Sequence, residues 1–116
     1  MHEVSIALGM LDELFRIAQE NHAIKITRVK LKIGKMSGIV TDSLKFAFDA
    51  VKLEHPLLSQ AAIVIEEVPL VYKCNDCHVS FNAADIYFPA CPECGSGNLQ
   101  LVSGEEQHIE SVEVEI

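Results

Sequence analysis

The chain has 116 residues, 49% of them hydrophobic, which suffices for one domain or for a small domain joined to a metal-bound module. Its net charge of −8 is unevenly distributed: residues 1–73 hold all nine Lys and Arg and nine Asp and Glu, whereas residues 74–116 hold eight acidic residues and no Lys or Arg. Binding to nucleic acid requires cations along the phosphates, so this distribution argues against a nucleic-acid partner. The sequence shows no basic leader and no apolar run of membrane-spanning length, so we expect a cytoplasmic protein with no membrane partner.

The first element that the sequence predicts is an amphipathic helix, which ends near Asn21 and His22. Its stripe recurs every three or four residues and consists of Val4, Ala7, Leu8, Leu11, Leu14, Phe15 and Ala18.

A strand follows, because Val29, Leu31 and Ile33 alternate with Arg28, Lys30 and Lys32 until the segment 34–38 interrupts the pattern. Thr41 is placed to cap a second helix, which Pro56 terminates. Its predicted buried stripe is Leu44, Ala47, Phe48 and Val51.

Residues 62–68 predict another strand, parallel to the first, and residues 70–104 predict a ribbon with Phe81, Tyr87 and Phe88 in its hairpins. The last segment alternates again, with Val112, Val114 and Ile116 expected to face inward, so we expect it to return to the first sheet. The predicted fold is therefore α+β, with two helices on a small mixed sheet. Its domains are residues 1–69 plus 105–116, and an inserted ribbon at residues 70–104.

The four cysteines of the chain form two pairs, Cys74 with Cys77 and Cys91 with Cys94. Two C-x-x-C turns that face each other supply the four thiolates of a tetrahedral structural zinc site. Two disulfides or a redox dithiol are the alternatives. The segment Cys-Pro-x-Cys-Gly favours zinc, because Gly95 can adopt the positive φ that such a turn needs.

A second candidate metal site lies at the N-terminus, where His2 follows Met1. A free amine, the amide nitrogens after it and an imidazole form a nitrogen-rich set that suits Cu(II) or Ni(II). A histidine at this position is also common as a plain surface residue, and Glu3 is also explained by the helix dipole.

Several segments together resemble the HypA/HybF family of hydrogenase maturation nickel chaperones. They are Met1-His2-Glu3, the segments 32–38, 44–48, 65–69 and 112–115, and both cysteine pairs. The resemblance implies that His2 binds nickel with the Met1 amine and the Glu3 backbone nitrogen. It also implies that Cys74, Cys77, Cys91 and Cys94 bind zinc.

The same resemblance implies Ni(II) as cargo for the large subunit of [NiFe] hydrogenase, with urease as a further recipient in some organisms. It also implies a HypB-type nickel GTPase as partner, and a homodimer stays open. Gln107 and His108 differ from the family pattern, which leaves the partner surface near the last strand in doubt.

The remaining residues indicate no enzyme, since every cysteine is assigned to metal and no phosphate-binding loop is present. His22 and His55 are interpreted as structural residues at helix ends. His78 is expected to be a solvated loop residue, with zinc ligation as the alternative, and His108 is a weaker candidate for nickel. A zinc-ribbon adaptor that binds only protein remains the alternative function.

Overall fold

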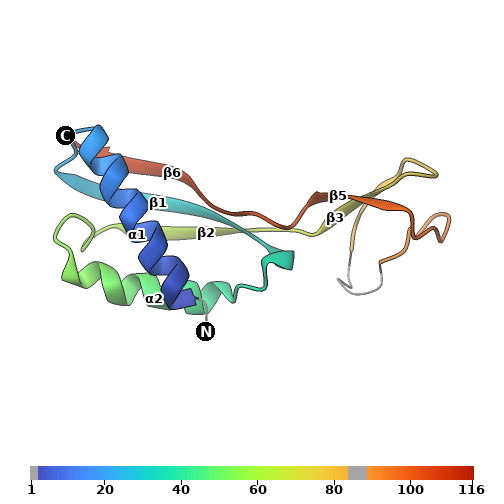
Figure 1. The fold of residues 1–116 in the computed structure, drawn as a ribbon, viewed down its shortest axis with the longest axis horizontal. Helices are drawn as coiled ribbons and strands as arrows, with labels where there is room; N and C mark the ends of the chain where they lie inside the picture. The colour runs from blue at the N-terminus through green and yellow to red at the C-terminus, as the bar shows by residue number, and fades with distance from the viewer. Residues whose placement is uncertain (1–2, 84–88) are drawn as a thin grey trace.

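The computed structural model describes residues 3–83 and 89–116, and it is an elongated molecule with extents of 54 × 28 × 17 Å (Figure 1). The elements in chain order are α1 (Glu3–Glu20), β1 (Lys25–Gly34), η1 (Lys35–Ser37), α2 (Thr41–Val51), η2 (Lys52–Glu54), β2 (Ala62–Val68), β3 (Val71–Cys74), β4 (Ser80–Asn82), β5 (Leu99–Ser103) and β6 (Gln107–Glu115). The strands form two three-stranded sheets, in the orders β2-β1-β6 and β4-β3-β5. Within the described residues, no helix is long and apolar enough to cross a membrane.

The first sheet is mixed, as the sequence predicts. Strand β1 lies at its centre and is parallel to β2 and antiparallel to β6. The parallel pairing requires a crossover, and α2 provides it. Apolar side chains of β1 are buried under the helices, whereas Lys30 and Lys32 face away and pair with Glu66 of β2 and Glu110 of β6. The predicted return of the last segment to this sheet is confirmed.

Helix α1 packs diagonally across the sheet and buries a stripe at spacings of four, three and four residues, formed by Ala7, Leu11, Leu14 and Ala18 (Figure 1). Val4 and Leu8, expected in this stripe, lie on its exposed flank. The helix ends with His22 at φ 54°, and the Ala23 and His22 N–H groups donate to the Ala18 and Gln19 carbonyls. This is a Schellman ending, in which a residue other than glycine takes the left-handed position.

Helix α2 buries Leu44, Ala47 and Phe48, as the sequence predicts. The predicted capping role of Thr41 is wrong. Val40 precedes the first helical residue and no side chain caps the helix, while the Thr41 hydroxyl donates to Glu67 of β2 at 3.0 Å. The hydroxyl therefore attaches the start of α2 to the edge of the sheet.

The inner face of β6 supplies Ile109, Val112 and Val114, which pack against the core. Ile116 continues the alternating pattern, but 85% of its surface is exposed because it lies one residue beyond the strand. Its predicted inward orientation is wrong.

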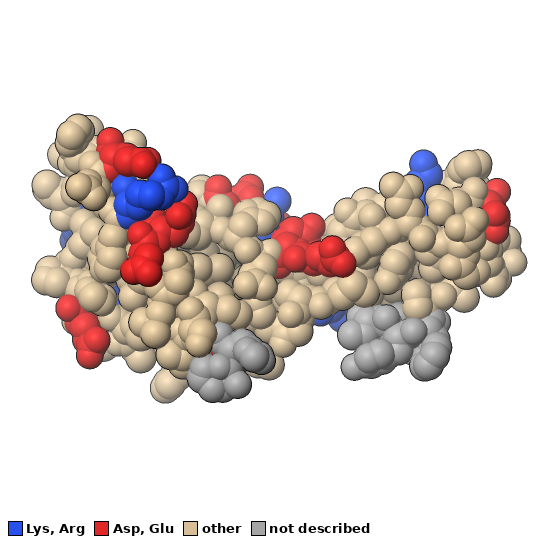
Figure 2. All heavy atoms as spheres, in the orientation of Figure 1, with Lys and Arg blue, Asp and Glu red and all other residues tan. Residues whose placement is uncertain are grey.

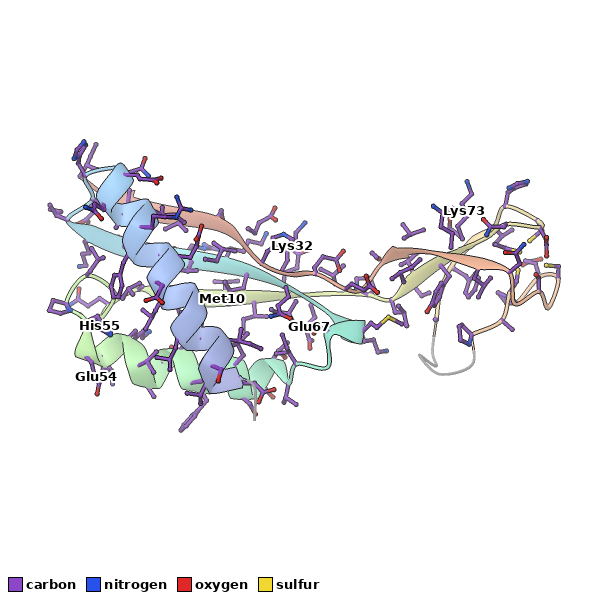
Figure 3. All side chains as sticks on the ribbon, in the orientation of Figure 1. Met10, Lys32, Glu54, His55, Glu67 and Lys73 are labelled. Atoms are coloured by element: carbon purple, nitrogen blue, oxygen red, sulfur yellow. The ribbon has the colours of Figure 1, made fainter. Side chains whose placement is uncertain are left out.

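The second sheet belongs to the ribbon. Tyr72 of β3 lies opposite Phe81 of β4 and Leu101 of β5, and the two aromatic rings are 6.2 Å apart. Tyr87 lies outside the described residues, as does Phe88. Lys73, the cation nearest the cysteines in the sequence, lies on this sheet (Figure 3).

A tight joint connects the two sheets. The Gly34 N–H donates to the Glu106 carbonyl at 2.6 Å, and the Met36 N–H donates to the Gly104 carbonyl at 2.7 Å. A Cβ on Gly34 would lie 2.1 Å from the Gly104 carbonyl oxygen, so only glycine allows this approach. The pKa of Glu106 is lowered by its own N–H and by the Gly104 N–H, which both donate to the carboxylate. The joint therefore holds the ribbon to the sheet through backbone contacts.

Candidate metal centre

The four cysteines lie on two turns of the same construction. In the first turn the His78 N–H donates to the Cys74 carbonyl, and in the second the Gly95 N–H donates to the Cys91 carbonyl. His78 and Gly95 follow the second cysteine of their pairs and have φ values of 67° and 74°. The predicted positive φ of Gly95 is confirmed, and the left-handed backbone of His78 repeats it in the first turn.

The two turns are also bonded to each other. The Asn75 N–H donates to the Asn98 carbonyl at 2.9 Å, and the two Asn side chains are joined at 3.1 Å. The Ser96 hydroxyl donates to the Asp76 carboxylate. These bonds fix the distance between the turns without the help of a large apolar core.

The four sulfur atoms converge on one point. All lie within 4.8 Å of one another, and the Cys74 and Cys94 sulfurs, like the Cys77 and Cys91 sulfurs, are 3.5 Å apart. A tetrahedral ion with sulfur ligands at about 2.3 Å has sulfur–sulfur edges of about 3.8 Å. Two of the sulfur–sulfur distances are 3.5 Å and the rest do not exceed 4.8 Å, so the donors fit a tetrahedral metal. The sequence prediction that the two pairs form one group is confirmed.

The protonation of the metal-free thiols is uneven. The Cys77 N–H, which lies 3.4 Å from the Cys74 sulfur, lowers the pKa of Cys74 to about 7. For Cys77, the Val79 N–H favours the thiolate, but the neighbouring Cys91 sulfur and burial outweigh it and raise its pKa to about 12. A bound cation must therefore displace thiol protons before all four sulfurs can act as ligands.

The second predicted site, at Met1 and His2, lies outside the described residues. The next residue, Glu3, is the first residue of α1. The Glu3 carboxylate accepts a hydrogen bond from the Val40 N–H at 3.3 Å. A hollow of about 550 Å³ adjoins Glu3 and is lined largely by apolar side chains, among them Val4 and Phe46, the latter 77% exposed. The start of α1 is thus fixed against the start of α2.

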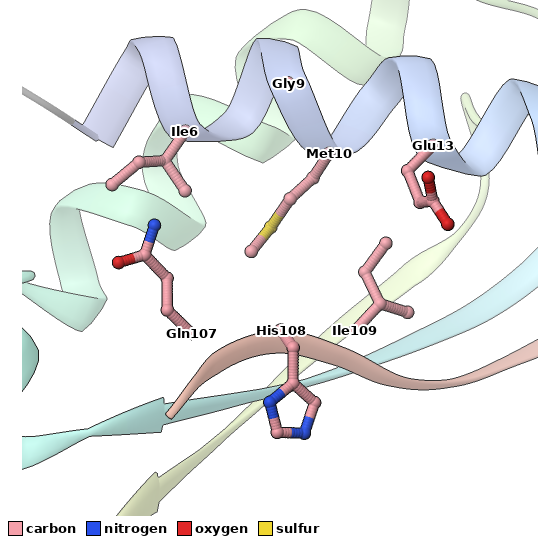
Figure 4. Close-up of a pocket in the computed structure, with 7 residues that line it drawn as sticks. All are labelled: Ile6, Gly9, Met10, Glu13, Gln107, His108 and Ile109. Carbon is pink, nitrogen blue, oxygen red and sulfur yellow. The ribbon is translucent and has the colours of Figure 1, made fainter. Parts of the chain in front are cut away.

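The other histidines have distinct surroundings. Of the described residues, the four cysteines are the group that the geometry brings together, and exposed His78 is not part of it. His108 lies 3.6 Å from Glu110 and points away from α1 (Figure 4). The His55 ring packs edge-on against Phe15 with centroids 5.0 Å apart, below α1 (Figure 3).

Sequence reasoning missed two features near these sites. The joint at Gly34 and Gly104 depends on a contact between residues seventy positions apart in the sequence, which no local pattern reveals. The bond between Glu3 and Val40 likewise depends on how the two helices pack. For Gly34, the signal available in the sequence was a glycine that ends an otherwise regular strand.

Fold and site together define a small α+β protein that carries a four-cysteine metal-binding ribbon. The family model described as "Hydrogenase/urease nickel incorporation, metallochaperone, hypA" matches residues 1–114, and the chain belongs to this family.

The similar proteins match this chain over nearly their whole length. Hydrogenase maturation factor HypA of Chlorobium luteolum is 41% identical over 97% of this chain and 94% of its own length. The HypA protein of Moorella thermoacetica is 37% identical over 99% and 100%, respectively. The solution structure of the Ni metallochaperone HypA from Helicobacter pylori matches with a TM-score of 0.68 and 27% identity, covering 99% of this chain and 98% of that one.

Proposed function

We propose that this protein binds Ni(II) at its N-terminus and delivers it for the maturation of [NiFe] hydrogenase, while the ribbon holds a structural zinc ion. The observation that carries the proposal is membership of a nickel-incorporation family, with a match that begins at residue 1. The four clustered thiols support the second metal.

In the proposed nickel site, His2 is the principal ligand, assisted by the Met1 amine and the Glu3 backbone nitrogen. The hydrogen bond from the Val40 N–H to the Glu3 carboxylate supports this arrangement, because it fixes the first turn of α1 beside the start of α2. Nickel is cargo here, so the site must release it as well as bind it.

In the proposed zinc site, the ligands are Cys74, Cys77, Cys91 and Cys94. Four thiolates in a tetrahedral arrangement favour zinc over Ni(II), which prefers tetragonal nitrogen and oxygen donors. The ion would stabilise the ribbon, which has few buried side chains of its own, and residues 70–104 would form a folding unit apart from residues 1–69 and 105–116. The protein would act as a carrier in the cytoplasm and not as an enzyme.

The proposed partners are a HypB-type nickel GTPase and the large subunit of [NiFe] hydrogenase. Urease is proposed as a second recipient, since the description of the family names both hydrogenase and urease.

The test is calorimetric titration of Ni(II) into protein with its authentic N-terminus and into protein that carries one additional residue before Met1. We expect the extension to weaken nickel binding sharply and to leave zinc content unchanged, because only a free terminal amine can close the chelate. His2→Ala should have the same effect, and His78→Ala is the matched control. Equal nickel affinity of the authentic and extended proteins would place the nickel site elsewhere. Absence of nickel binding by both would favour the alternative function, a zinc-ribbon adaptor that binds only protein.

A further inference from the structure

A groove of about 440 Å³ separates α1 from β6 (Figure 4). Ile6, Met10 and Glu13 line it from one stripe of the helix, and Gln107 and Ile109 line it from the strand. In Figure 4 the Met10 side chain extends from the helix toward the strand, and Ile109 extends from the strand toward the helix. Ile6, Met10 and Ile109 are only partly buried, so the groove leaves apolar surface open to solvent.

The strand that forms one wall of the groove is an edge strand. Among the described strands, β6 pairs with β1 alone, so its other side presents unpaired backbone N–H and C=O groups over nine residues. A helix and an edge strand on either side of an apolar groove are what strand addition needs. The edge supplies main-chain hydrogen bonds, and the groove receives alternate side chains of the added segment.

The charge of β6 restricts which segments can pair with its free edge. Residues 105–116 contain five Glu and no Lys or Arg, and Arg28 and Lys32 of β1 pair with two of them, Glu113 and Glu110. Acidic side chains follow this side of the molecule from α1 toward the second sheet (Figure 2). A second β6 would place like charges against each other, which disfavours pairing between two copies of the chain.

Gly9 gives independent support. It lies in the middle of α1, where glycine weakens a helix, and a Cβ at this position would meet nothing within 4 Å. Packing within the described residues therefore does not require a glycine here. Gly9 lines the groove, and its bare backbone allows another chain to approach the helix closely.

From this arrangement we propose that the groove between α1 and β6 binds an extended segment of a partner protein in which basic and apolar residues alternate. The apolar side chains enter the groove and contact Met10 and Ile109. The basic side chains project to the other face of the sheet, toward Glu110 and Glu113. None of the residues that line the groove is a proposed metal ligand, so the proposal does not rest on the nickel chemistry.

The test uses the full chain loaded with zinc, labelled for NMR, and three peptides. The first peptide is acetyl-Lys-Val-Lys-Val-Lys-Val-Lys-amide. The second has Glu in place of every Lys. The third contains the same residues as the first, but all of its Lys residues precede all of its Val residues. We expect the alternating basic peptide to shift and protect the β6 amides, and the acidic peptide not to bind. The third peptide should bind at least about tenfold more weakly, because charge without alternation cannot fill the groove.

Two substitutions localise the binding. Met10→Lys should weaken the alternating peptide by about tenfold or more, because it places a like charge in the groove, whereas Gln19→Lys adds the same charge on the other flank of α1 and should have little effect. If Met10→Lys does not fold, the double substitution of Glu110 and Glu113 by Gln replaces it and should weaken binding and reduce its salt dependence. Equal binding of the two basic peptides, shifts confined to residues away from β6 and α1, or self-association through β6 would overturn the proposal.

Discussion

Replacing Gly34 by Ala tests whether the joint between the two sheets determines stability. The new Cβ would lie 2.1 Å from the Gly104 oxygen, 2.2 Å from its carbonyl carbon and 2.6 Å from the Glu105 nitrogen. All three are backbone atoms, so no flexible side chain can move aside. The strand and the segment opposite it must separate.

The cost follows from two effects. Overpacking of a tight contact destabilises by about 1–3 kcal/mol. Separation also weakens the hydrogen bonds that Gly34 and Met36 donate across the joint, each contributing about 0.5–1.5 kcal/mol. The sum is a loss of about 2–6 kcal/mol, a large part of the stability of a small domain.

The measurement is urea denaturation followed by far-ultraviolet circular dichroism, with zinc present throughout. Gly9→Ala is the matched control: its Cβ meets nothing, and alanine favours the helix, so stability should rise by up to about 1 kcal/mol. If Gly34→Ala unfolds at the same urea concentration as the unchanged protein, the contact between Gly34 and Gly104 is not the close approach described here.

Two further outcomes follow from the metal centre. Cys91→Ser should increase amide exchange throughout residues 70–104 while α1 keeps its protection, because the proposed zinc ion would stabilise the ribbon, whereas the first sheet has its own core. Hydrogen exchange measured by mass spectrometry checks this, and loss of protection in both parts would mean that they form one cooperative unit. Zinc affinity should rise with pH, because each thiol proton must leave before its sulfur can bind the metal. The pKa of Cys77 is raised to about 12, so this thiol is protonated at neutral pH. The pKa of Cys74 is lowered to about 7, so this thiol is already partly ionised there. Competition with a chromophoric chelator between about pH 6 and pH 8 measures the slope, and an affinity that does not change with pH would contradict thiolate ligation.

The predictable parts of the structure were those fixed by local patterns. The alternation of Lys30, Leu31 and Lys32 located β1, and the period of two after residue 104 predicted the return of β6, because a half-buried strand imposes that period directly. The cysteine spacing predicted the candidate metal centre, because it too is a local pattern. Two short turns can bring four sulfurs together with little help from the rest of the fold.

The parts that sequence did not reveal depend on contacts between distant segments. Thr41 has the chemistry of a capping residue, yet its hydroxyl bonds to Glu67, because the crossover places the start of α2 beside β2. Leu8 fits the period of the α1 stripe, but it lies on the flank of that stripe and 49% of its surface is exposed. The groove between α1 and β6 belongs to the same category, since its two walls lie about a hundred positions apart in the sequence.

The position of the ribbon in the chain has an evolutionary consequence. The chain enters the ribbon after β2 and leaves it before β6, and the Ser103 hydroxyl donates to the Pro69 carbonyl at 2.8 Å, so entry and exit lie side by side. A short turn could bridge that gap and preserve the order β2-β1-β6. Insertions or deletions inside the ribbon would therefore leave the register of the first sheet unchanged, and the two ends of the molecule could change independently in evolution.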